Sequence, residues 1–184
     1  MDTLFRITHS SNFNTSIQAL MLIEQLATAK HLSVDRFYRT LYESLLDPRL
    51  ITSSKHALYL NLMFRSLRSD LNIKRVKAFV KRMMQIITLH QPAFICGIIY
   101  LIRELEQTFP ALRSLFNDPE VTEEDEEEVF RDVPENGASI VEAPAVETVG
   151  YSSEAYDGKK RDPEHSHADK SCLWEIVSAT KSKT

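Results

Sequence analysis

The chain has 184 residues, 43% of them hydrophobic and 26% charged, with a formal net charge of −4. That length suffices for one ordinary domain. Two cysteines are too few for a disulfide framework and indicate a reducing intracellular compartment. Residues 1–12 lack the apolar core of a secretory signal. No membrane partner is expected, because the longest apolar run has ten residues and a membrane span needs about 20.

The charge is divided unevenly along the chain. Residues 1–117 carry 15 Lys and Arg against 8 Asp and Glu, whereas residues 118–184 carry 7 against 18. This asymmetry indicates a basic body followed by an acidic tail.

Three helices are predicted in the first 70 residues, because apolar residues recur there at helical spacing behind capping residues. Their expected ranges are 13–30, 34–46 and 55–69. Residues 1–11 show no period and are expected to form a frayed lead-in.

A basic amphipathic helix is predicted next, with Asn72 as its cap. Apolar residues repeat every three or four positions from Ile73 to Ile87, and no acid occurs among residues 73–90. Lysines and arginines fall around the rest of its circumference. Between Arg65 and Arg82 there are seven of them, with Asp70 as the single acid.

A nearly all-apolar helix is predicted at 93–109, after a turn at Gln91-Pro92, and a short closing helix begins at Pro110. A helix that is apolar on all sides must be covered on all sides. Gly inside a helix costs about 1 kcal/mol relative to Ala. Cys96 and Gly97 are therefore expected to mark a close contact with another helix.

The helix starts near residues 13, 54 and 92 lie about 40 positions apart, a period typical of HEAT or armadillo repeats. The alternative is an irregular helical bundle, since the units share little sequence. No strand alternation with Gly-rich turns occurs before Phe116.

Residues 118–135 contain ten acids and one arginine, which leaves too few apolar groups to order the chain. We predict a disordered linker over 117–150. It is either a solvated spacer or a tract that contacts basic partner proteins or masks the basic helix.

Two separated stretches carry a family resemblance: RVKAFVKRMMQI with PAFICGIIYLIRELEQTFPALRSLF, and the C-terminal YDGKKRDPEHSHADKSCLWE. Both resemble the CCAAT-binding factor / nucleolar complex family. The resemblance implies a nucleolar helical-repeat protein that helps to assemble the large ribosomal subunit. Family members are large chains, so it also implies a fragment or short isoform. In the C-terminal motif, Leu173 and Trp174 are the expected anchors.

No enzyme chemistry is expected. The chain has neither a glycine-rich phosphate loop nor a G-x-S-x-G elbow. His165, His167, Asp169 and Cys172 lack the paired spacing of a zinc site. No cofactor, metal or small-molecule substrate is therefore expected.

Cationic side chains on a helix attract phosphates independently of base sequence. The alternative is a solvated face whose lysine stems cover apolar neighbours. The candidate RNA-binding residues are Arg65, Arg68, Lys74, Arg75, Lys77, Lys81, Arg82, Lys159, Lys160 and Arg161.

The predicted fold is all-α, HEAT/armadillo-like, with a disordered acidic segment and an extended C-terminal motif. The predicted domains are a helical-repeat body at 1–116, which forms part of a CCAAT-binding factor domain, the linker at 117–150, the motif at 151–176 and a divergent tail at 177–184. The expected function is a scaffold in 60S subunit biogenesis and pre-rRNA processing, in the nucleus and nucleolus. Expected partners are pre-ribosomal RNA, the pre-60S particle and another helical-repeat protein of the same family. The alternative is a transcription cofactor at CCAAT-type promoters.

Overall fold

The computed structural model describes residues 1–30, 34–117 and 156–175. These residues form seven α-helices and several 3-10 turns, with no strand among them, so the all-helical prediction is confirmed for this part of the chain. None of the described helices combines the length and the apolar content that crossing a bilayer requires.

The first two helices are α1 (Asp2–Thr8) and α2 (Phe13–Lys30). The prediction of a frayed lead-in over residues 1–11 is wrong, because α1 packs along α2 and buries Phe5 and Thr8. The predicted bounds of α2 are confirmed. The side chain of Asn12 accepts a hydrogen bond from the Asn14 amide, which is 2.9 Å away, just before this helix.

The second pair is α3 (Asp35–Ser44) and α4 (His56–Arg68), joined through the 3-10 turn η1 (Pro48–Leu50). α3 ends at Ser44, two residues before the predicted end at 46, and Asp47 caps η1 by accepting from the Arg49 amide.

The third pair is α5 (Ile73–Ile86) and α6 (Pro92–Thr108), with η2 (Ile87–Leu89) between them. The predicted cap is confirmed, because the Asn72 side chain accepts from the amides of Lys74 and Arg75 at 3.1 and 3.4 Å. η3 (Pro110–Arg113) and α7 (Ser114–Asn117) form the short closing element predicted after Pro110.

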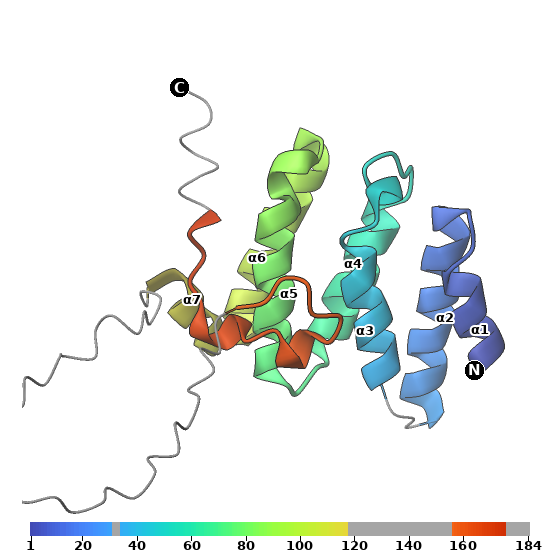
Figure 1. The fold of residues 1–184 in the computed structure, drawn as a ribbon, viewed down its shortest axis with the longest axis horizontal. Helices are drawn as coiled ribbons and strands as arrows, with labels where there is room; N and C mark the ends of the chain where they lie inside the picture. Colours follow the sequence, from blue (N-terminus) through green and yellow to red (C-terminus); the bar gives the residue numbers. More distant parts are fainter. Residues whose placement is uncertain (31–33, 118–155, 176–184) are drawn as a thin grey trace, which may run out of the picture.

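The three pairs lie side by side, α1 with α2, α3 with α4 and α5 with α6 (Figure 1). Helix α4 contacts both α2 and α6, which places these three in one layer. On the other side, the Phe79 ring of α5 packs edge-on against Tyr38 and Tyr42 of α3, with centroids 6.3 and 5.0 Å apart. The stacked arrangement agrees with the repeat hypothesis, but repetition itself stays a prediction.

Helix α6 is not covered on all sides, contrary to the expectation from its apolar run. Phe94, Ile98 and Leu105 face the core, whereas Ile99 and Tyr100 are 53% and 63% exposed. Cys96 is exposed as well. Among the described residues, α6 is the last long helix of its layer, so no following helix covers this face.

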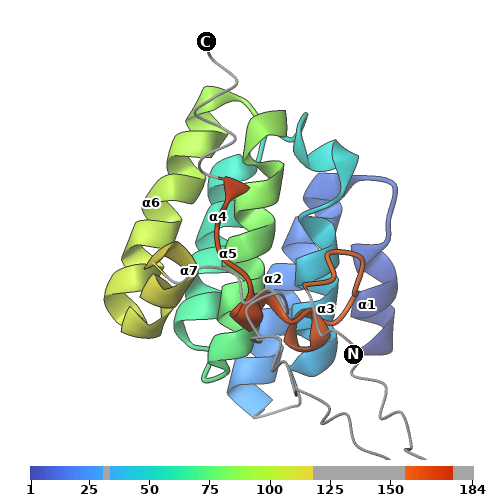
Figure 2. The same ribbon diagram turned by 60° about the vertical axis from the view of Figure 1, so that its left-hand side comes forward.

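Residues 156–175 form an extended segment with two 3-10 turns, η5 (Pro163–His165) and η6 (Ala168–Lys170). Figure 2 shows this segment, drawn in orange to red, crossing in front of α3 and α5. The predicted extended C-terminal motif is therefore observed over the described part of 151–176. The predicted domain divisions, the motif at 151–176 included, stay predictions, and the linker beyond Asn117 and the tail at 177–184 lie outside the described residues.

Candidate functional site

The basic helix α5 is the element on which the C-terminal segment rests. η5 and η6 of this segment both contact α5, and η5 also contacts α3. Three of the five candidate residues on α5 are buried: Arg75 is 8% exposed, Lys81 0% and Arg82 1%. The expected arrangement of basic residues on an open helix face is therefore wrong for these three side chains.

Lys81 is enclosed by the end of the C-terminal segment. Its Nζ lies 3.0 Å from a carboxylate oxygen of Glu175 and also donates to the Cys172 carbonyl. The rings of Tyr156 and Trp174 lie 5.5 and 5.3 Å from Nζ, within cation–π range. The ammonium thus has a counter-ion, a carbonyl acceptor and two aromatic faces, which together compensate for its loss of water.

Arg82 connects α3 to the beginning of the same segment. Its guanidinium donates to the Tyr42 carbonyl at 3.2 Å and to the carbonyls of Gly158 and Lys160 at 2.6 and 3.1 Å. The guanidinium also stacks on the Tyr42 ring, 3.3 Å from the centroid. Burial raises the pKa of the Tyr42 hydroxyl, so this ring stays neutral beside the cation.

Arg75 is held within the body. It forms two hydrogen bonds to the Asp70 carboxylate, at 2.6 and 2.8 Å, and lies 3.4 Å from Asp35. Its guanidinium is 4.2 Å from the centroid of the Tyr38 ring. Burial, with a further contribution from Asp70, raises the pKa of Tyr38 to about 12.

The remaining candidates on α5 are more accessible. The Lys74 side chain is 61% exposed, and its Nζ lies 3.6 Å from the Asp169 carboxylate. Lys77 is half-buried and donates to the Ser114 hydroxyl of α7 at 2.6 Å. Hence Lys74, Lys77 and Lys81 differ in exposure and do not form one open ridge.

The other candidate cations are distributed over α4 and the C-terminal segment. On α4, Arg65 pairs with Glu24 at 2.8 Å, and Arg68 is exposed beside the Phe64 ring. On the segment, Arg161 pairs with Glu43, while Lys159 and Lys160 are exposed to solvent. The structure therefore offers several separate cationic positions, and RNA contact at each stays a prediction.

The expected anchors differ in burial. Leu173 is 5% exposed, and its amide donates to the Leu115 carbonyl at 2.8 Å. Trp174 is 53% exposed, and its ring holds the segment mainly through the cation–π contact with Lys81. A Cβ on Gly97 would lie 2.5 Å from Leu60 Cδ1, which agrees with the predicted close helix contact.

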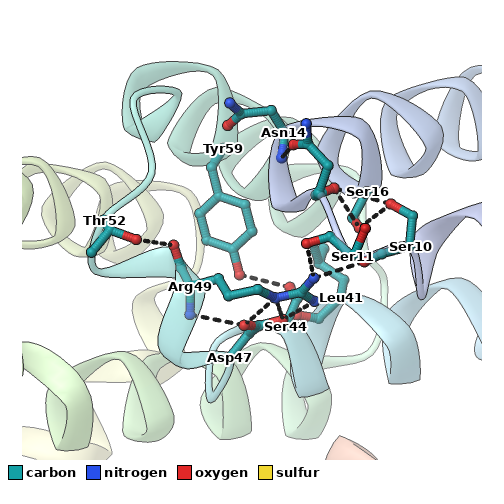
Figure 3. Close-up of polar contacts among 11 residues, drawn as sticks. Ser10, Ser11, Asn14, Ser16, Leu41, Ser44, Asp47, Arg49, Thr52 and Tyr59 are labelled. Atoms are coloured by element: carbon teal, nitrogen blue, oxygen red, sulfur yellow. Dashed lines mark hydrogen bonds and ion pairs between the residues drawn. The ribbon is translucent and has the colours of Figure 1, made fainter.

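A polar cluster around Arg49 has no counterpart in the sequence-based predictions (Figure 3). Arg49 donates to the Ser10 and Ser11 carbonyls at 2.7 and 2.8 Å and to Asp47 at 2.6 Å. The Arg49 hydrogen bonds lower the pKa of the Asp47 carboxyl. Because Arg49 bonds to main-chain carbonyls of the α1–α2 turn, residue types alone give no signal for this cluster. Its arrangement joins two helix pairs and contains no nucleophile–base pair.

His165, His167, Asp169 and Cys172 have side chains of the kinds that bind metals, but they do not form a metal site in the structure. Among the described residues, no three His, Cys, Asp or Glu side chains come close enough to hold a metal ion. His167 instead adopts a left-handed backbone conformation, with φ of 55°, at the start of η6.

Residues 16–182 match the model of the CBF/Mak21 family. Ribosome biogenesis protein NOC1 of Chaetomium thermophilum is 66% identical over 183 residues, which cover 96% of this chain and 17% of that protein. CCAAT/enhancer-binding protein zeta of Homo sapiens is 48% identical over 72% of this chain and 12% of its own length. Nucleolar complex protein 1 of Drosophila melanogaster is 36% identical over 56% of this chain and 9% of its own length.

The chain thus spans about a fifth or less of each of these relatives. The resemblance to the CCAAT-binding factor / nucleolar complex family is confirmed, and the fungal protein has a higher identity than human CCAAT/enhancer-binding protein zeta. The expected non-enzymatic character agrees with relatives that are named as ribosome biogenesis and nucleolar proteins. The family match covers most of the sequence, and the chain belongs to the CBF/Mak21 family.

Proposed function

We propose that this protein is a non-enzymatic scaffold in ribosome biogenesis, acting in the nucleolus on precursors of the large (60S) subunit and on pre-rRNA processing. The observation that carries this proposal is the 66% identity to Ribosome biogenesis protein NOC1 over 96% of the chain. The similarity to Nucleolar complex protein 1 supports the nucleolar location. In this proposal the stacked helix pairs are HEAT- or armadillo-like repeats, which hold partners along an extended surface.

The proposed RNA contacts use the cations that remain accessible. Arg68, Lys159 and Lys160 are exposed, and Lys74 has only a long pairing with Asp169. Lys77 of α5 is half-buried and is the second cation that this helix offers to RNA, beside Lys74. Arg65 and Arg161 are exposed but paired, so each would have to exchange a carboxylate partner for a phosphate. Such contacts bind the RNA backbone and carry no base specificity.

The exposed face of α6 supports a protein partner. Tyr100, Gly97 and Leu101 border a shallow groove whose other wall is formed by Leu60 and Phe64 of α4. Exposed apolar surface of this kind marks interaction sites in soluble proteins. We propose that another helical-repeat protein of the nucleolar complex family covers this groove.

Sedimentation of a nuclear extract tests the proposal against its alternative, a transcription cofactor at CCAAT-type promoters. Co-migration with large-subunit precursors, and its loss after RNase treatment, is the expected result. Enrichment on chromatin without any precursor-associated fraction would favour the transcriptional function.

A further inference from the structure

We propose that the outer side of α5 is a docking groove for an extended peptide, and that residues 156–175 are its tethered ligand. We use the name docking groove for the contact surface formed by side chains and carbonyls of Tyr42, Lys81, Arg82, Gln85 and Leu115. The inference is that these contacts hold the segment in place without help from the covalent connection. It is independent of the proposed RNA function.

The docking groove binds the main chain of the segment near both of its ends. Arg82 donates to two carbonyls at the start of the segment, and Lys81 donates to the Cys172 carbonyl near its end. The Leu115 carbonyl accepts the Leu173 amide at 2.8 Å. Donor and acceptor groups of the peptide backbone are therefore both bound at defined places, as in other modes of extended-peptide recognition.

Small and apolar side chains of the segment supply its buried anchors. Pro163 is buried, Ala168 is 2% exposed, and both lie in the 3-10 turns that contact α5. Leu173 is 5% exposed and belongs to the same apolar core as Leu115. The Tyr156 hydroxyl donates to the Gln85 side chain at 3.0 Å. Anchors at both ends and the middle fix the register of the segment.

Ion pairs fix its direction, because the segment pairs through a cation near its start and through carboxylates further along. Arg161 pairs with Glu43 of α3, and the Asp162 carboxylate lies 3.8 Å from Arg39. Further along, Asp169 faces Lys74 at 3.6 Å and Glu175 faces Lys81 at 3.0 Å. A reversed segment would bring like charges together. The groove thus fits an extended peptide with a basic start, a proline, a leucine ten positions later and a carboxylate near its end.

Within the segment, the bonds are local. The Asp157 amide donates to the Ser166 carbonyl at 2.9 Å, and the two 3-10 turns directly follow Asp162 and His167. Residues 156–174 therefore take their shape from these turns and from their contacts with α3, α5 and α7. This is the arrangement of a bound peptide.

The test uses the full chain with a protease site inserted between Gly137 and Ala138. After cleavage in native buffer, the two fragments should co-elute on size exclusion at about 1 μM, a concentration at which weaker pairs separate. Separation of the fragments under these conditions would overturn the proposal.

Peptide exchange then tests the groove itself. A labelled synthetic peptide of residues 156–175 should exchange into the cleaved protein. The same peptide with Leu173→Glu should compete at least about tenfold more weakly, because it buries an unpaired charge. The matched control is His165→Glu, which adds the same charge at an exposed position and should compete within about threefold of the original. Equal competition by all three peptides would show that the named anchors do not hold the segment and would overturn the proposal.

Discussion

The Nζ of Lys81 lies 3.0 Å from the Glu175 carboxylate, although the two residues are 94 positions apart in the chain. Lys81 is fully buried, and the Glu175 side chain is 7% exposed. The pair ties the centre of the basic helix to the end of the family motif. A residue that the sequence places among RNA-binding candidates is thus part of the interior of the protein.

Replacing Lys81 with Met should destabilise the fold, because it leaves the Glu175 carboxylate buried without its counter-ion. Breaking a buried pair from one side costs about 3–5 kcal/mol. Urea unfolding followed by circular dichroism measures the change. The matched control is Lys74→Met, which removes an exposed lysine and should cost about 0–1 kcal/mol.

The double variant Lys81→Met/Glu175→Met should recover much of the stability that Lys81→Met removes, since an apolar pair of similar volume can replace a buried ion pair at little cost. If the double variant is as unstable as Lys81→Met alone, the loss comes from packing around the lysine rather than from an unpaired carboxylate.

Gly97→Leu should cost roughly 1–3 kcal/mol by overpacking the contact between α4 and α6. The reason is that even a Cβ at this position would lie 2.5 Å from Leu60 Cδ1. Denaturant unfolding reports the loss. A free energy of unfolding equal to that of the unsubstituted protein would show that α4 and α6 are not in close contact here.

Leu60→Ala in the Gly97→Leu background is the informative control. If the two side chains compete for the same space, the double variant should be more stable than the sum of the single effects predicts, as neighbouring sites are coupled. Strict additivity would contradict the assignment of Leu60 as the obstructing side chain.

Stability should fall as the pH is lowered through the range in which His90 titrates. Burial, with a contribution from the nearby His56, lowers the pKa of His90 from its ordinary 6.5. The unfolded chain then binds a proton more readily than the folded one, so the stabilisation is complete above about pH 6.5 and is lost below it. Unfolding curves of the protein and of His90→Gln, measured at pH 7.5 and pH 5, should differ in how strongly the free energy of unfolding depends on pH. A pH dependence unchanged by the substitution would contradict this assignment.

RNA affinity should depend on the exposed lysines of the C-terminal segment. Lys159→Gln/Lys160→Gln should weaken binding to single-stranded RNA of any sequence and flatten the salt dependence by roughly 0.7 for each phosphate that the protein no longer neutralises. Lys30→Gln/Lys55→Gln removes the same charge from exposed positions outside the candidate set. Identical affinity and salt slope for both variants would argue against a specific RNA surface at Lys159 and Lys160.

Local signals predicted most of the helices. Asn72 caps α5 and Asp47 caps η1, because a capping side chain acts within a few residues of its own position. Gly97 marks a close contact because glycine inside a helix is unfavourable unless another element approaches it. The fold class and the extended C-terminal motif followed from periodicity and from the family resemblance.

The sequence-based predictions were wrong for residues 1–11 and for the exposure of the basic side chains on α5, for two physical reasons. α1 is only seven residues long and is stabilised by packing on α2 rather than by a pattern of its own. The burial of Lys81 and Arg82 depends on partners that lie 76 to 94 positions away, beyond the reach of any local pattern. One signal was present, since the motif carries acids and aromatic rings that complement a basic helix.

Amide hydrogen exchange at Leu173 tests most directly whether the basic helix holds the C-terminal segment. The Leu173 amide donates to the Leu115 carbonyl. It belongs to the same peptide bond as the Cys172 carbonyl, which accepts from Lys81. We predict protection of this amide approaching that of the α5 amides, with selective loss of protection in Lys81→Met while α5 remains protected. A Leu173 amide that exchanges in the unsubstituted protein at the rate of an unstructured peptide, with α5 still protected, would contradict the account.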